Sequence, residues 1–259
     1  MPTVRGRRFG AVVLAIAMLF AACGGGDDDT ISADDTSSSS SSSSTSAPGS
    51  SSTEPTESTE PTAPAVLPGE PTDFGPRAGG TVAVVGVAFD DELNVRSAPG
   101  VSNAIVATLA PTAAAGATGN NRLLGGSIWY EIDADGTTGW ANGAFLLGLG
   151  DTRDITSQVI SQLGSRPSAA TMLGLGRMVA DSQASTDVES DIVMVVAPTG
   201  GDLGEVTYDV IGLADDSVGG LRLHVFGQRE SSGAGFGLKS VEATSLCSRS
   251  FGPAGDLCA

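Results

Sequence analysis

The sequence has few of the residues from which catalytic and metal sites are usually built. Its 259 residues include one His, three Cys, two Trp and two Tyr. A single His, His224, excludes a zinc site with several His ligands, and its apolar neighbours place it on the polar face of a strand. The sequence contains no Gly-x-Ser-x-Gly segment that could present a nucleophilic Ser. We therefore expect no catalytic residue, no metal ligand and no cofactor.

Basic residues are also scarce. Lys and Arg number 13 against 30 Asp and Glu, which gives a net charge of −17. Loss of residues 1–22, which carry three Arg and no acidic residue, makes it −20. Such a surface repels nucleic-acid phosphates and anionic lipid head groups. We expect no nucleic-acid partner and no membrane binding through a basic surface.

The N-terminal apolar run is too short for a permanent transmembrane helix. Ala11–Phe20 is half the length that crosses a bilayer, and three Arg residues precede it, which is typical of a signal peptide. Ala21 and Ala22 then lead to Cys23 in a segment that resembles a lipobox. We expect residues 1–22 to be removed and Cys23 to be lipidated, which holds the protein on the outer face of the cell membrane. The alternatives are an ordinary secretory signal cleaved near Ala22 and an incidental Cys.

Residues 23–78 are rich in Ser, Thr, Pro and Asp and contain little that a core could bury. Such a composition cannot offset the entropy of ordering, so we expect a disordered tether. As a flexible coil it would span about 40 Å.

The two remaining cysteines lie close together near the C-terminus. With Cys23 assigned to the anchor, Cys247 and Cys258 are left as an even pair. In an exported protein such a pair predicts a disulfide, which contributes about 3 kcal/mol through chain entropy.

A β-rich pattern begins after the tether. Leu93-Asn94-Val95-Arg96 alternates apolar and polar residues, and Ser97-Ala98-Pro99-Gly100 has the composition of a turn. Further strands are predicted at 81–87, at 105–109, near Ala117, and at 128–132 and 137–140 around an Asp/Gly turn. Asp133 and Asp135 of that turn have no bidentate Glu at calcium-loop spacing.

Together, the 93–100 stretch, the Trp-Tyr strand at 129–130 and the Gly-Trp at 139–140 resemble the bacterial SH3 family. The resemblance covers roughly residues 81–147 and implies a small all-β barrel at 79–148. Members of that family bind cell-wall peptides or other proteins through an aromatic groove. The residues that match are Trp129, Tyr130 and Trp140.

Packing is the alternative role for these three aromatic residues. Trp129 and Tyr130 are neighbours in a strand, so one of them faces outward and is the better groove residue. Asp90, Asp91 and Glu92 are candidates for an acidic rim that binds a cationic peptide; solvated loop charge is the alternative.

The pattern turns helical after Gly148-Leu149-Gly150. Two helices, one from Asp154 to Gly164 and one from Pro167 or Ser168, precede strands at 192–197, 206–211, 221–226 and about 236–246. We therefore expect residues 149–259 to form a separate α+β domain with a mainly antiparallel four-stranded sheet.

These patterns favour a lipid-anchored, non-catalytic envelope protein whose SH3-like barrel binds cell-wall peptide or an envelope protein. One alternative is a cell-wall hydrolase in which carboxylates such as Asp209, Asp215 and Asp216 are catalytic and the barrel targets the enzyme. Another is a structural barrel with a sensor or partner-docking C-terminal domain.

Overall fold

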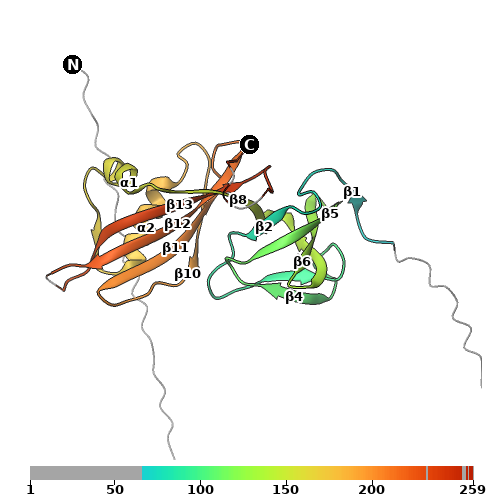
Figure 1. Cartoon of the computed structure of the whole chain (residues 1–259), viewed down its shortest axis with the longest axis horizontal. Coiled ribbons are helices and arrows are strands. Elements are labelled where there is room, and N and C mark those ends of the chain that lie inside the picture. The colour runs from blue at the N-terminus through green and yellow to red at the C-terminus, as the bar shows by residue number, and fades with distance from the viewer. Residues whose placement is uncertain (1–65, 232, 253–254, 256, 259) are drawn as a thin grey trace, which may run out of the picture. The chain divides into compact units, whose positions relative to one another are not determined.

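The computed structural model describes residues 66–231, 233–252, 255 and 257–258 (Figure 1). All of them belong to one compact unit, residues 60–259. Cys23 and most of the predicted tether lie outside the described residues. Within the described part of the chain, no helix is both long enough and apolar enough to cross a bilayer.

Strands make up most of the regular secondary structure of the described chain. The strands are β1 (Glu70–Pro71), β2 (Thr81–Val84), β3 (Leu93–Arg96), β4 (Ile105–Leu109), β5 (Ala114–Leu124), β6 (Ser127–Ala134), β7 (Thr137–Asn142), β8 (Leu146–Asp154), β9 (Ser168–Ala169), β10 (Asp191–Val196), β11 (Leu203–Ile211), β12 (Val218–Arg229) and β13 (Phe236–Cys247). The helices are the 3-10 turn η1 (Gly143–Phe145), α1 (Thr156–Leu163) and α2 (Met172–Gln183).

These strands form one antiparallel sheet. Its 13 strands follow the order β10-β11-β12-β13-β8-β2-β5-β6-β7-β3-β4, with β1 on β5 and β9 on β13 (Figure 1). The predicted fold class, an SH3-like barrel followed by a separate α+β domain, is therefore wrong. The local prediction was better, because the strands expected at 93–96 and 105–109 are confirmed as β3 and β4.

Strand β8 joins the two halves of the sheet and explains the error. It pairs with β2 through Leu146 and Leu147 and with β13 from Gly148 onward. A Cβ on Gly148 would collide with the backbone oxygen of Ser250, and one on Gly150 would lie 3.0 Å from the sulfurs of both Cys247 and Cys258. The two glycines at the predicted domain boundary instead admit the C-terminal tail against a continuous strand.

The single sheet has two apolar cores. The first contains Val82, Val95, Tyr130, Ile132 and Leu146 among others, and Phe251 of the C-terminal tail packs against it. In the second core, α1 and α2 cover one face of β11–β13.

Helix α2 shows where helix prediction succeeded and where it failed. It begins at Met172 with Thr171 as its cap, later than the predicted 167 or 168, because Ser168–Ala169 pairs with β13. Leu175 and Val179 face the core as expected, whereas Met178 is exposed.

Candidate functional site

The hairpin of β6 and β7 separates the three predicted groove residues. Tyr130 faces the core, 8% exposed, with its ring centroid 6.1 Å from that of Phe251, and burial raises its pKa. Trp129 and Trp140 lie on the opposite face, where they stand across from Asn142 and Glu131 respectively. Trp129 therefore lies on the sheet face opposite the core that contains Tyr130, and its side chain is nevertheless buried, at 4% exposed.

Trp129 forms part of a hollow of about 430 Å³, which we call the Trp129 groove. Its apolar lining is Val87, Leu93, Val101, Trp129, Phe145 and Val193. Its polar lining includes Asp91, Glu92, Asn94, Arg96 and Asn142. A hollow with apolar walls and a few polar groups is the usual form of a ligand site.

Trp140 lines a different hollow. That hollow is more polar and includes Asn120, Asn121 and Arg122. The structure thus places Trp129 in the groove, Trp140 in the separate polar hollow and Tyr130 in the core, and all three side chains are less than 10% exposed.

Solvent reaches the groove along its apolar sides. Val101 is 75% exposed and Phe145 40%, while Trp129 is only 4% exposed and contributes mainly support for the wall. The groove can therefore cover apolar groups of a ligand through Val101 and Phe145.

The wall at residues 85–89 is held from three sides. The Val85 N–H donates to the carbonyl oxygen of Phe145 at 3.0 Å, and the Phe89 N–H donates to that of Met194 at 2.9 Å. Between them, the Gly86 N–H donates to Asp209 Oδ2 at 3.0 Å. Because Met194 and Asp209 belong to β10 and β11, the C-terminal half of the sheet shapes the groove.

A buried ion pair fixes Asp209. Arg222 donates through Nε to Oδ1 at 2.8 Å and through Nη2 to Oδ2 at 2.9 Å. Nη2 also donates to the carbonyl oxygen of Val84 at 2.7 Å. The Asp209 side chain is fully buried and that of Arg222 is 12% exposed, so the pair is a well-satisfied bidentate contact.

The sequence did not predict this role of Asp209, which was a candidate catalytic carboxylate in the hydrolase alternative. Asp209 and Arg222 are directly opposite in the β11–β12 register, 13 residues apart in the chain. Each lies on the polar side of an alternating strand, which was the available signal. Only the strand register shows that they meet.

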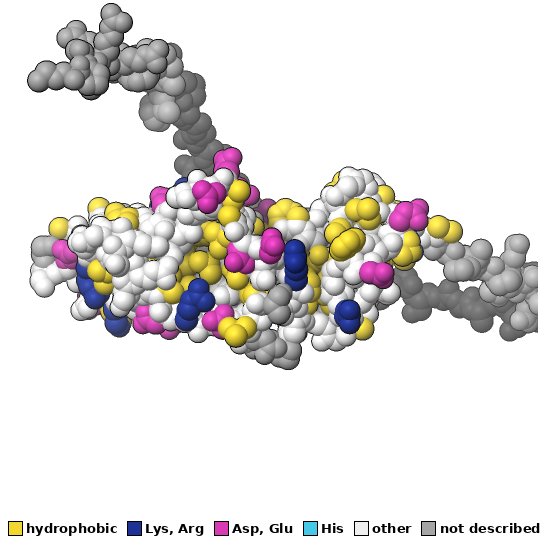
Figure 2. Space-filling model, turned by 90° about the horizontal axis from the view of Figure 1, so that it is seen from above, with side chains coloured by type: hydrophobic (Ala, Val, Ile, Leu, Met, Phe, Trp, Pro, Cys, Tyr) yellow, Lys and Arg dark blue, Asp and Glu magenta, His cyan; other side chains and the backbone are white. Residues whose placement is uncertain are grey.

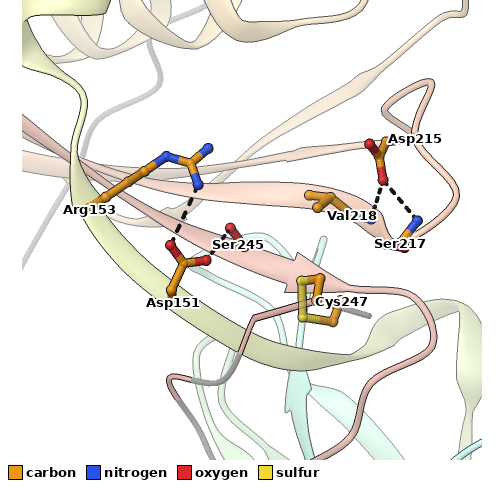
Figure 3. Close-up of a disulfide and its surroundings, with 8 residues drawn as sticks. Asp151, Arg153, Asp215, Ser217, Val218, Ser245 and Cys247 are labelled. Atoms are coloured by element: carbon orange, nitrogen blue, oxygen red, sulfur yellow. Dashed lines mark hydrogen bonds and ion pairs between the residues drawn. A yellow bond between two sulfur atoms is a disulfide. The ribbon is translucent and has the colours of Figure 1, made fainter.

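Asp215 also has a structural role, because it accepts two backbone hydrogen bonds. Its Oδ1 accepts the N–H groups of Val218 at 2.7 Å and Ser217 at 2.8 Å (Figure 3). These two bonds lower the pKa of the Asp215 carboxyl, with the Val218 bond the larger cause. Asp215 therefore stabilises the turn before β12.

His224 lies on the sheet face away from the helices, as its alternation predicted. Its Nε2 is 3.0 Å from Glu205 Oε2, and its ring lies 4.1 Å from that of Phe226. Within the described residues no group of three or more His, Cys, Asp or Glu side chains is placed to hold a metal ion.

The predicted disulfide is confirmed. Cys247, the last residue of β13, is bonded to Cys258 of the C-terminal tail, near Asp151 of β8 and Ser245 of β13 (Figure 3). The Ser245 hydroxyl lies 3.0 Å from Asp151 Oδ1, so polar contacts continue along the β8–β13 pair next to the disulfide.

Comparison of the chain with protein-family models, curated proteins and solved structures finds no match.

Proposed function

We propose that this protein is exported, anchored to the cell membrane through a lipid on Cys23, and binds a cell-wall peptide or an envelope protein in the Trp129 groove. The observation that carries the binding role is the groove itself, with apolar walls and Asp91 and Glu92 on its edge. The anchor rests on the sequence of residues 1–23 and on the polar tether that follows.

Charge supports a protein or peptide ligand over nucleic acid. The chain carries 13 basic against 30 acidic residues. Figure 2 shows acidic and basic side chains interspersed on one face, with no broad basic patch there. A polyanion gains little from such a surface.

The proposal is non-catalytic, and the roles of Asp209 and Asp215, two of the three candidate carboxylates, support that choice. Both oxygens of Asp209 accept hydrogen bonds from Arg222, and one also accepts the Gly86 N–H. Asp215 holds a turn through two backbone bonds. A carboxylate committed in this way is not free to accept a proton from substrate or water.

Retention of envelope material on the immobilised mature chain tests the binding role. Purified cell wall and detergent-extracted envelope proteins are passed over separate columns. We expect one of them to be retained, and retention to fall when Phe145 is replaced by Ser. If neither column retains a ligand, the binding role is wrong.

A matched variant controls for loss of surface hydrophobicity. Leu123 on β5 is 45% exposed, close to the 40% of Phe145, and does not line the groove. Leu123→Ser is expected to bind as the unaltered chain does. Equal losses from both variants would show that binding does not use the groove.

Cell fractionation tests the anchor. Cys23→Ala removes the acceptor of the lipid, so the variant is expected in the soluble extracytoplasmic fraction. Retention of the variant in the membrane fraction would contradict lipid anchoring.

A further inference from the structure

Asp91 and Glu92, at the edge of the Trp129 groove, lie between two hollows, and we call these two residues the ridge. On the far side of the ridge a further hollow, of about 540 Å³, is lined by the apolar residues Phe89, Ala110 and Pro111 and by the polar residues Asp90, Asp91, Glu92 and Asn94. Asp91, Glu92 and Asn94 line both this hollow and the Trp129 groove. A ligand that crosses the ridge therefore contacts both hollows and the carboxylates between them.

Apolar side chains reach solvent on both sides of the ridge. Phe89 is 44% exposed in the hollow beyond the ridge, and Phe145 and Val101 are 40% and 75% exposed in the Trp129 groove. Single exposed apolar residues need no explanation, but a group around one hollowed surface is typical of a binding site.

The ridge carboxylates have room for a cationic partner. Neither Asp91 nor Glu92 forms an ion pair within the described part of the chain. Arg96, which also lines the groove, is engaged elsewhere, because its Nη1 donates to the Asn103 carbonyl oxygen at 2.8 Å. Residues 24–76 cannot supply the cation, since they contain no Lys or Arg, and Arg77 lines a different hollow.

We infer that the occupant is an extended segment of another protein, with Lys or Arg over the ridge and a bulky apolar side chain two residues to either side. Alternate side chains of an extended segment share one face, so this spacing directs all three groups at the surface. The exposed Phe89, Phe145 and Val101 offer contacts to bulky apolar side chains in both hollows, which favours a protein segment as the occupant. The inference rests on the proposed function, because it names the ligand class of the same site.

Capped synthetic peptides and the whole mature chain test this inference. The reference peptide is Trp-Ser-Lys-Ser-Leu, with binding measured by calorimetry. Replacing its Lys with uncharged norleucine is expected to weaken binding about fivefold at low salt, the usual upper range for exposed charge pairs. Replacing either apolar residue with Gly is expected to weaken it further.

Two protein variants test which part of the protein surface contacts each residue of the peptide. Asp91→Asn with Glu92→Gln is expected to abolish the preference for Lys over norleucine; the amide introduced at position 91 keeps an oxygen for the backbone bond that Asp91 now accepts from Glu92 N–H. Phe89→Ser is expected to weaken the reference peptide but to leave one of the two Gly peptides unaffected. Asp187→Asn, an exposed carboxylate away from the ridge, is the control.

The outcomes separate this inference from the proposed function. Equal binding of the Lys and norleucine peptides would overturn the inference, and so would failure of every peptide to bind. If cell wall or envelope proteins were still retained through Phe145, the proposed function would survive that result. If neither column retained a ligand, both the inference and the proposed function would be wrong.

Discussion

At the scale of single residues, two carboxylates show how burial decides the role of an acid. Asp209 is fully buried and bonded to Arg222, whereas Asp154 lies at the surface before α1. The first links the two halves of the sheet, and the second stabilises a helix start.

Breaking the buried pair is expected to be costly. Asp209→Asn leaves the charge of Arg222 without its partner, so the free energy of unfolding should fall by about 3 to 5 kcal/mol. Urea unfolding at neutral pH measures the change. Asp181→Asn is the control, because the Asp181–Arg177 pair is 54% exposed on both sides and should contribute only about 0.5 kcal/mol. Equal losses from the two variants would contradict the role assigned to Asp209.

Asp154 is expected to make stability depend on acid pH. The hydroxyl and then the backbone N–H of Thr156 lower the pKa of the Asp154 carboxyl below its ordinary value. The folded state therefore gains stability above the unfolded pKa, which is about 3.9, and loses it as the pH falls through the lower folded pKa. Asp154→Asn should flatten the fall in stability below about pH 4, measured by thermal unfolding. An unchanged pH profile would refute this role.

At the scale of elements, the C-terminal tail connects the two cores. Cys258 returns the tail to Cys247, and between them Phe251 packs against Tyr130 of the other core. The Thr81 N–H donates to the Phe251 carbonyl oxygen at 3.0 Å, at the start of β2. The disulfide thus holds a segment that contributes to a distant part of the sheet.

Removal of the disulfide is expected to loosen that distant part. Cys247→Ser with Cys258→Ser should lower the free energy of unfolding by about 3 kcal/mol, since the closed loop is short. Amide exchange should accelerate in β2 and β6 as well as in β13. Phe251→Ala, which keeps the disulfide, should accelerate exchange in β2 and β6 alone. Acceleration confined to the tail in both variants would show that Phe251 does not support that core.

At the scale of the whole molecule, the groove depends on strands far apart in the chain. Its wall at 85–89 is held by Asp209 and Met194, and Val193 forms part of its lining. A boundary between residues 148 and 149 would cut β8, which runs from Leu146 to Asp154.

A fragment of residues 79–148 is therefore expected to fold poorly. It lacks most of β8, the partners of Gly86 and Phe89, and the Phe251 side chain. It should show little cooperative thermal unfolding, whereas residues 66–259 should unfold in a cooperative transition. Cooperative unfolding of the fragment with intact peptide binding would contradict this dependence on the C-terminal half.

Local pattern was a good guide to most elements and a poor guide to their assembly. Alternation located β3, and β-branched composition located β4, both with correct bounds, because periodicity and composition are local properties. The same rule cannot show which strands pair, so the change from strand to helix periodicity after Gly148-Leu149-Gly150 was interpreted as a domain boundary. It also left Trp129 and Tyr130 equivalent as groove candidates until the core showed which face was buried.

The sequence by itself determined most of the strands, but not β1, β8 or β9, together with the two helical segments and the pairing of Cys247 with Cys258. Each of these follows from local periodicity, from composition or from counting. Only the tertiary structure decided that the strands form one sheet, that Asp209 meets Arg222, and that Trp129 rather than Trp140 lines the groove. Those outcomes depend on strand register and on close approach between distant segments. Local sequence patterns carry no direct record of either.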